Sequence, residues 1–255
     1  MDTHTRLTIA QCPQNPSEAK VMENKPYRGV VGRNMYACTG TRADIAFPLH
    51  ELTRFLVNPG ISHWNAALRV VRYLYTTKDW SLTYEGKRSL DLELEDAPEG
   101  YVDADGQMAD DRKAVTGWVF IIDGGAVSWS SRSQTLVSLS TAESEYVAAV
   151  DASKEGIWIR SFISQVFEPT YQIIRGPSTL HSDNQAAIAI SKDHQFHART
   201  KHIDIRYHFI RYVIEDGKIR LVYCPTEEMV ADIMTKSLPS AKAKHFAIRM
   251  GLGPV

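Results

Sequence analysis

The 255-residue sequence has few cysteines and no long apolar run. Cys12, Cys38 and Cys224 are far apart and form no Cys-x-x-Cys pair, so neither a zinc knuckle nor a disulfide framework is indicated. No window approaches the roughly 18 consecutive apolar residues of a membrane span, and we expect no membrane partner. The N-terminus lacks the basic and apolar regions of a secretory signal. We therefore expect an intracellular protein in a reducing compartment.

An excess of charge of one sign is also lacking. With 29 Lys and Arg against 30 Asp and Glu, the net charge is −1, which argues against a polybasic nucleic-acid binder and a disordered acidic tail. The charges are nevertheless unevenly distributed: residues 1–85 carry 10 basic and 7 acidic residues, residues 86–190 carry 8 and 16, and residues 191–255 carry 11 and 7. An acidic centre suited to cations therefore lies between basic flanks suited to phosphate.

Composition and periodicity divide the chain into four parts. Residues 1–25 are polar and aperiodic, and we expect a flexible leader. Residues 26–85 are predicted to be helical, because Trp64, Ala67, Leu68, Val71 and Leu74 form one apolar stripe. The acidic segment 86–99, which contains Pro98, is interpreted as a linker. Residues 100–255 form the second predicted domain.

Strand and helix signals alternate in the second domain. A hairpin is predicted from two apolar strands on either side of Asp123-Gly124-Gly125, and a capping box at 140–143 opens a long helix towards Phe167. A strand ending at Asp183, helices over 184–191 and 202–215, a strand over 218–223 and a helix over 227–236 follow. This order predicts an α/β fold, a mixed α+β arrangement in which helices flank a mixed sheet.

Four acidic residues stand at the ends of predicted elements. They are Asp103 after the first strand of the second domain, Glu145 in the capped helix, Asp183 at a strand end and Asp232 within an apolar stretch. Strand ends and helix starts converge at one edge of such a sheet. Clustered carboxylates raise one another's pKa, and hard divalent cations offset the repulsion. The pattern suits phosphodiester cleavage, in which two ions about 3.5–4 Å apart hold the attacking and leaving oxygens.

Structural alternatives exist for these acids and their neighbours. Asp183 could cap the following helix, Asp105 and Asp123 suit turns, and Glu143 suits the capping box. Glu145 has no capping role, and Asp232 is flanked by apolar residues, where an unpaired buried carboxylate is costly. Spacing alone leaves the cluster undecided.

The local sequence around all four acids resembles the ribonuclease H domain of copia-type LTR retrotransposon polyproteins. The matching stretches are Tyr101–Asp105, Asp111–Lys113, Gly117–Phe120, Ser128–Ser131, Ser138–Ala148, Ser182–Ile188, His197–Phe209 and Val230–Lys236. The first domain resembles the segment that joins polymerase to ribonuclease H, through Tyr27–Gly32, Thr41–Ala46, Asn58–Gly60 and His63–Leu74. Two departures are Gly106, where the family usually has Trp, and 114–116, where Ala-Val-Thr replaces Ser-Thr-Ser.

The resemblance implies a ribonuclease H-like fold and four metal ligands. Asp103 matches the acid of Tyr-x-Asp, Glu145 the acid before Tyr-Val-Ala, Asp183 that of Ser-Asp-Asn and Asp232 that of Ala-Asp-x-x-Thr-Lys. It further implies two Mg²⁺ or Mn²⁺ ions and hydrolysis of the RNA strand of an RNA–DNA hybrid. The Tyr-x-Asp-Asp motif of a polymerase palm is absent, since Ala104 follows Asp103. We expect no DNA synthesis, and a reverse-transcriptase palm would be a partner supplied by another chain or by a parent polyprotein.

A basic, histidine-rich stretch lies between Lys192 and Arg211. Its histidines are His194, His197, His202 and His208, and its other cations are Arg199, Lys201 and Arg206. No cysteine or second tight histidine pair completes a zinc site. A solvated helix face remains an alternative to the nucleic-acid-binding role that we predict for Arg199, Lys201, Arg206 and Arg211, which would contact the hybrid backbone.

We interpret the sequence as a retrotransposon-derived, metal-dependent endonuclease acting on RNA–DNA hybrids. One alternative is a non-catalytic retroelement remnant that binds nucleic acid or a polymerase partner. The intact acids argue against decay, whereas the missing palm favours fragmentation. An integrase-like nuclease is a third hypothesis, but its acids run Asp, Asp, Glu along the chain, whereas here the order is Asp, Glu, Asp, Asp.

Overall fold

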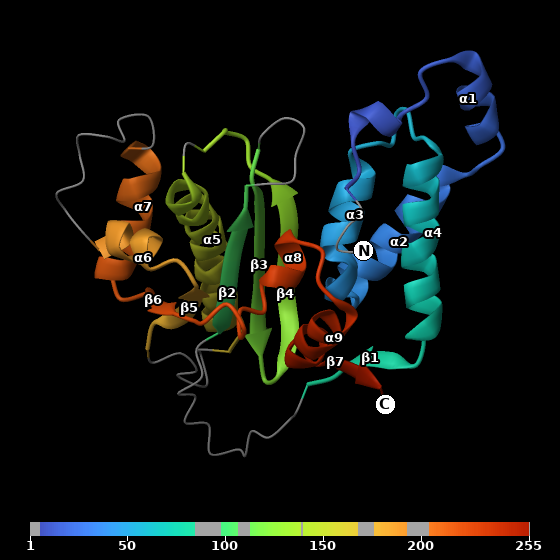
Figure 1. The fold of residues 1–255 in the computed structure, drawn as a ribbon. Coiled ribbons are helices and arrows are strands. Elements are labelled where there is room, and N and C mark those ends of the chain that lie inside the picture. The colour runs from blue at the N-terminus through green and yellow to red at the C-terminus, as the bar shows by residue number, and fades with distance from the viewer. Residues whose placement is uncertain are drawn as a thin grey trace.

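A five-stranded sheet forms the centre of the protein (Figure 1). The structure is a computed structural model that describes residues 6–84, 98–106, 113–138, 140–167, 176–192 and 204–254, and the side chains of all these except 167 and 204–208. The strands are β2 (Glu99–Asp105), β3 (Val115–Ile122), β4 (Gly125–Ser133), β5 (Ser178–Ser182) and β6 (Ile219–Tyr223). Their order is β4-β3-β2-β5-β6, with β4, β3 and β2 antiparallel and with β5 and β6 added parallel to β2.

The predicted β3–β4 hairpin is present. Asp123 and Gly124 connect the strands with φ angles of 53° and 78°, the left-handed conformations that a tight hairpin turn requires. Side chains then alternate between the two faces of the sheet, so that Tyr101 and Val119 belong to one hydrophobic core and Val102 and Phe120 to the other.

Three helices cover the face to which Val102 and Phe120 point. They are α5 (Thr141–Phe167), α6 (Gln185–Lys192) and α7 (Asp204–Glu215), and they lie together on one side of the sheet in Figure 1. The Oγ of Ser140 accepts a hydrogen bond from the Glu143 backbone N–H at 3.2 Å, which is the predicted cap at the start of α5. This cap fixes where α5 begins relative to the sheet.

The opposite face is covered by both ends of the chain. Its elements are α2 (Tyr27–Gly40), η2 (Ala43–Ile45), α3 (Ala46–Thr53), α4 (Ile61–Thr76), α8 (Asp232–Thr235) and α9 (Ser240–Arg249). One hydrophobic core includes Val31 and Leu49 from the N-terminal helices, Val119 from the sheet and Met234 from α8. Strand β1 (Trp80–Leu82) also pairs antiparallel with β7 (Leu252–Pro254), as Figure 1 shows. The N-terminal helices therefore pack directly against the sheet domain.

The expected mixed sheet flanked by helices is confirmed, with two corrections to local structure. The segment expected to be a flexible leader contains η1 (Ile9–Gln11) and α1 (Pro16–Met22), and Leu7 and Met22 are buried. The helix expected over 227–236 is regular only over α8, because turns occupy most of the preceding residues. Of the expected linker, only 98–99 is described, so the domain division stays a prediction. None of the described helices is long and apolar enough to span a membrane.

Candidate active site

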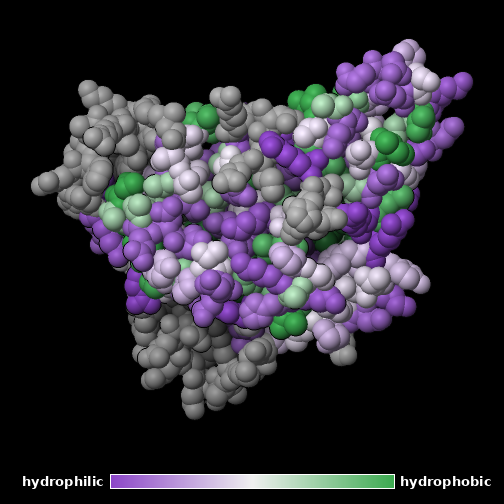
Figure 2. Space-filling view, viewed as in Figure 1, coloured by the Kyte–Doolittle hydropathy of each residue, from purple (hydrophilic) through white to green (hydrophobic). Residues whose placement is uncertain are grey.

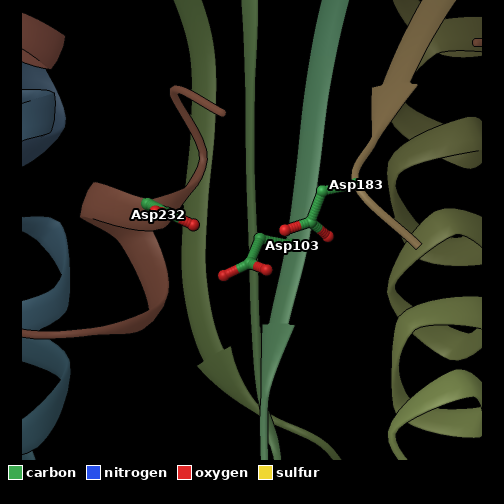
Figure 3. Close-up of side chains that lie close together, drawn as sticks. All are labelled: Asp103, Asp183 and Asp232. Atoms are coloured by element: carbon green, nitrogen blue, oxygen red, sulfur yellow. The ribbon is translucent and has the colours of Figure 1, made fainter. Parts of the chain in front are cut away.

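Three aspartates from separate elements meet beside the sheet (Figure 3). Asp103 lies on β2 and is 2% exposed, Asp183 directly follows β5, and Asp232 is the fully buried first residue of α8. One carboxylate oxygen from each lies within 4.8 Å of the others. In Figure 3 the Asp103 carboxylate lies between those of Asp183 and Asp232. The structure therefore brings together three of the four acids predicted from the sequence.

Local structure explains why these carboxylates are directed to one place. The side chain of Asn184, not Asp183, caps α6, because its Oδ1 accepts the Ala187 N–H at 2.9 Å. Asp183 is thereby left to accept a hydrogen bond from the Thr226 hydroxyl at 2.9 Å. On β3, Gly117 pairs with Asp103 in the sheet register, and the absence of a side chain there lets α8 approach closely.

The fourth predicted acid, Glu145, enters from α5 and lines the same cavity as Asp103 and Asp183. It is 4% exposed, and its Oε2 atom has no hydrogen-bond partner among the described residues. Burial raises the pKa of Glu145 to about 10, and the negative charges of Asp103 and Asp183 act in the same direction. The carboxylate oxygens of Glu145 are not among those that lie within 4.8 Å of one another. Glu145 is therefore a neighbour of the three-aspartate cluster and not a member of it.

Two lysines hold Asp232 in place. The Nζ atom of Lys236 lies 2.8 Å from Oδ1 of Asp232 and 3.5 Å from Oδ2 of Asp103. The Nζ atom of Lys242 lies 2.8 Å from Oδ2 of Asp232. The Thr235 hydroxyl donates to Asp103. Burial raises the pKa of Asp103, and the charge of Lys236 opposes that rise.

Sequence reasoning did not assign a role to Thr226, Thr235, Lys236 or Lys242. Thr235 and Lys236 belong to the Ala-Asp-x-x-Thr-Lys stretch that carried the resemblance, and the i, i+4 spacing of Asp232 and Lys236 is a readable signal for an ion pair. Thr226 and Lys242 reach the site through the tertiary fold, and nothing in the local sequence indicates them.

Of the four predicted nucleic-acid-binding residues, only Arg211 has a side chain that the structure describes. Arg199 and Lys201 fall outside the described residues, and the side chain of Arg206 on α7 is not described. Arg211 is half-buried, and its Nη2 atom donates to the Ile190 carbonyl of α6 at 3.5 Å. Their contact with nucleic acid stays a prediction.

The donor set fits a divalent cation. Carboxylate oxygens are the ligands that Mg²⁺ and Mn²⁺ prefer. Glu145, whose buried Oε2 atom finds no hydrogen-bond partner among the described residues, lines a cavity of about 660 Å³. Hydrophilic residues predominate across the middle of the molecular face shown in Figure 2. Gly106, one of the two departures from the family pattern, is exposed and has open space where a side chain would begin, so it leaves the acids undisturbed.

A second cavity, of about 490 Å³, lies between α4 and the start of α9. It is lined by one acid, Asp44, whose carboxylate is bound by Arg42 at 2.8 Å and by the Tyr73 hydroxyl at 2.6 Å. We therefore place the candidate active site at the sheet, where the acids gather.

Comparison with solved structures gives low overall similarity. The structural match to the ribonuclease H1 of Halobacterium salinarum covers 54% of this chain and 93% of that protein's chain, at 16% identity and a TM-score of 0.37. LC11-RNase H1 in complex with an RNA/DNA hybrid covers the same shares at 14% identity and a TM-score of 0.38. No protein-family model matches the chain.

Sequence comparison is more informative. The Pol polyprotein from transposon TNT 1-94 of Nicotiana tabacum is 39% identical over 94% of this chain, and that from transposon RE2 of Arabidopsis thaliana is 31% identical over 99%. The chain spans only 17% and 16% of these polyproteins. The secreted RxLR effector protein 161 of Plasmopara viticola is 37% identical over 54% of this chain and 94% of its own length. Almost the whole chain aligns with a segment of the Pol polyproteins from transposons TNT 1-94 and RE2, so its homologues are copia-type retrotransposon Pol polyproteins.

Proposed function

We propose that this chain is a metal-dependent endonuclease that hydrolyses the RNA strand of RNA–DNA hybrids. The observation that carries the proposal is the convergence of Asp103, Asp183 and Asp232 within 4.8 Å, next to the buried carboxyl group of Glu145. Homology to copia-type Pol polyproteins and the ribonuclease H-like mixed sheet support a nuclease-type role for such a site. Acids gathered without sufficient counter-charge are otherwise costly to bury.

The chain's own residues would position the cations and the substrate. Asp103, Asp183 and Asp232 would supply oxygens, and Glu145 would give up its proton to become the fourth ligand. When bound, two Mg²⁺ or Mn²⁺ ions would supply the Lewis acidity that in-line phosphodiester hydrolysis requires. Asn184 and Gln185 lie in the cavity wall beside Asp183, where their amide groups can contact a nucleotide. The 2′-hydroxyl is the group that distinguishes RNA from DNA at such a site.

The basic stretch around Arg199, Lys201, Arg206 and Arg211 is the proposed contact for the hybrid backbone. Lys and Arg release condensed counterions from phosphates, so each contact would steepen the salt dependence of binding without selecting sequence. In the family context, a reverse-transcriptase palm from another chain or from a parent polyprotein is the proposed protein partner.

The decisive experiment incubates the chain with an RNA–DNA hybrid, duplex RNA and duplex DNA, each with Mg²⁺ and with EDTA. We expect cleavage of the RNA strand of the hybrid only when Mg²⁺ is present. Asp183→Asn should lower this cleavage by at least about a hundredfold, because the ions supply several kcal/mol of transition-state stabilisation. Circular dichroism should show the same secondary structure for the variant and the unmodified chain.

Asp123→Asn is the matched control, since it makes the same change in the β3–β4 turn, where Asn tolerates the observed φ of 53°. It should cleave like the unmodified chain. Full activity of Asp183→Asn would refute the proposed site. Hybrid binding without cleavage in Mg²⁺ or Mn²⁺ would favour the non-catalytic remnant instead.

A further inference from the structure

Lys236 lies at the cavity wall and contacts the buried Asp232. Lys236 lines this cavity together with Asp103, Glu145 and Asp183. Asp232 is completely buried and is not among the described residues that line it. Asp103 and Asp183 therefore face the cavity themselves, whereas Asp232 is connected to it through the Lys236 ammonium, 2.8 Å from its Oδ1 atom.

The Lys236 ammonium occupies the position that a cation bound to both Asp103 and Asp232 would need. Its Nζ atom bridges two of the three clustered carboxylates, at 2.8 Å from Asp232 and 3.5 Å from Asp103. The lysine side chain is 29% exposed, so the ammonium has a path to solvent along the cavity. A lysine carries its charge on a flexible four-carbon stem, which allows it to leave without moving the backbone.

Lys242 binds the same aspartate in a different way. Its Nζ atom contacts the other oxygen of Asp232 at 2.8 Å, donates to the Thr226 carbonyl at 3.2 Å and lies 5.1 Å from the centre of the Phe246 ring. Lys242 does not line the cavity and contacts no second member of the acidic cluster among the described residues. Lys242 therefore holds Asp232 through the oxygen that Lys236 does not contact, without reaching the cavity.

We propose that Lys236 is a built-in counter-cation that a divalent ion must displace from Asp103 and Asp232. In the metal-free protein its charge offsets the repulsion between the two carboxylates, and in the metal-bound protein it would compete with the ion for the same oxygens. Lys236 thus keeps the site folded without metal and sets the metal affinity. This inference rests on the proposed function, because it assumes that the acidic site binds a divalent cation.

The test measures metal binding and metal-free stability rather than activity. Lys236→Met removes the charge and keeps most of the apolar stem. Isothermal titration with Mn²⁺ should show tighter binding than in the unmodified chain, by about tenfold, the change that ~1.4 kcal/mol of lost competition produces. In EDTA the same variant should have a lower melting temperature. Lys236→Arg keeps the charge and should remain close to the unmodified chain in both measurements.

Two controls separate competition from a general change in charge. Lys242→Met removes one charge from the same aspartate without vacating the bridging position, and should raise Mn²⁺ affinity by less than about threefold. Lys244→Met changes an exposed residue of α9 and should alter neither quantity. Equal effects of Lys236→Met and Lys242→Met, or no tighter binding in Lys236→Met, would overturn the inference. If the unmodified chain cleaves the hybrid but Lys236→Met binds Mn²⁺ no more tightly, this inference fails and the proposed function stands. If the unmodified chain binds Mn²⁺ but does not cleave the hybrid, the proposed function fails and this inference stands.

Discussion

Two buried acids of the same site, Glu145 and Asp232, are stabilised in opposite ways. Asp232 has a lysine ammonium 2.8 Å from each of its oxygens. Glu145 has no such cation among the described residues, and Asp103 and Asp183 surround it with negative charge. Two lysines therefore balance the charge of Asp232, whereas Glu145 holds a proton in the metal-free protein because its pKa is raised to about 10. A divalent cation bound nearby would favour the negatively charged carboxylate and so cause Glu145 to lose its proton.

Glu145 should make the metal-free protein less stable as the pH rises. Its pKa is about 10 in the folded protein against 4.5 for an ordinary glutamate, so the folded form binds the extra proton between these values. Stability falls with rising pH wherever the folded form holds more protons than the unfolded form. Glu145→Gln, which imitates the protonated acid, should therefore stabilise the metal-free protein at pH 9 by about 1–3 kcal/mol, with little effect at pH 5.

Urea unfolding in EDTA at several pH values measures this change. Glu143→Gln, two residues earlier on α5, is the control and should leave the pH dependence of the free energy of unfolding as it is. A Glu145→Gln protein whose stability falls with pH as steeply as that of the unmodified chain would contradict the assignment.

At the scale of the element, α8 is positioned by a close approach to β3. A Cβ atom on Gly117 would lie 2.5 Å from Cγ2 of Thr235 and 2.6 Å from Cβ of Met234. Both contacts are shorter than carbon atoms allow. Because α8 carries Asp232 and Thr235, and Gly117 is the register partner of Asp103, this glycine fixes the spacing between the two acids.

Gly117→Ala should displace α8 and loosen the acidic cluster. We expect a loss of about 1–3 kcal/mol in the free energy of unfolding, as overpacked cores show, together with weaker Mn²⁺ binding. Gly32→Ala on α2 is the control, because nothing beyond the adjoining helix backbone lies within 4 Å of the place that its methyl group would occupy. That control should be neutral or slightly stabilising, since alanine favours helix more than glycine does. Unaltered Mn²⁺ affinity in Gly117→Ala would show that α8 is not held in this way.

Elements with strong local signals could be predicted from the sequence, and those formed by distant contacts could not. The Asp123-Gly124 turn and the Ser140 cap have local signals, so the hairpin and α5 are confirmed. The pairing of 80–82 with 252–254 has no local signal, because both strands are short and remote from one another. The helix predicted over 227–236 is regular only over α8, where the segment is buried against the sheet.

The same distinction applies to the candidate site. Resemblance and position at element ends selected Asp103, Glu145, Asp183 and Asp232. The structure places the three aspartates within 4.8 Å of one another, and Glu145 lines the same cavity as Asp103 and Asp183. The counter-charges could not be selected in the same way. Lys242 lies on α9, ten residues after Asp232, and only the tertiary fold brings its Nζ atom to 2.8 Å from that carboxylate.

At the scale of the whole molecule, the N-terminal helices and the sheet share one hydrophobic core. Leu49 on α3 is fully buried in the cluster that also contains Val119 and Met234. Nearby, Arg42 and Asp44 form a buried ion pair at 2.8 Å, and Arg42 also donates to Thr77. Since Thr77 directly follows α4, and Tyr73 of α4 donates to Asp44, these hydrogen bonds connect α4 to the segment that precedes α3.

This shared core predicts that the described part of the chain unfolds as one unit. Leu49→Ala should lower the free energy of unfolding by about 2–5 kcal/mol, the usual cost of emptying a core position. Hydrogen exchange should show the amides of β2 and β3 losing protection together with those of α3 and α4, because the helices and the sheet lose the same core. Val57→Ala, at a position that is 86% exposed, should change the stability by less than about 0.5 kcal/mol. Loss of protection confined to the helices would instead mean that the sheet, with its acidic site, is stable without them.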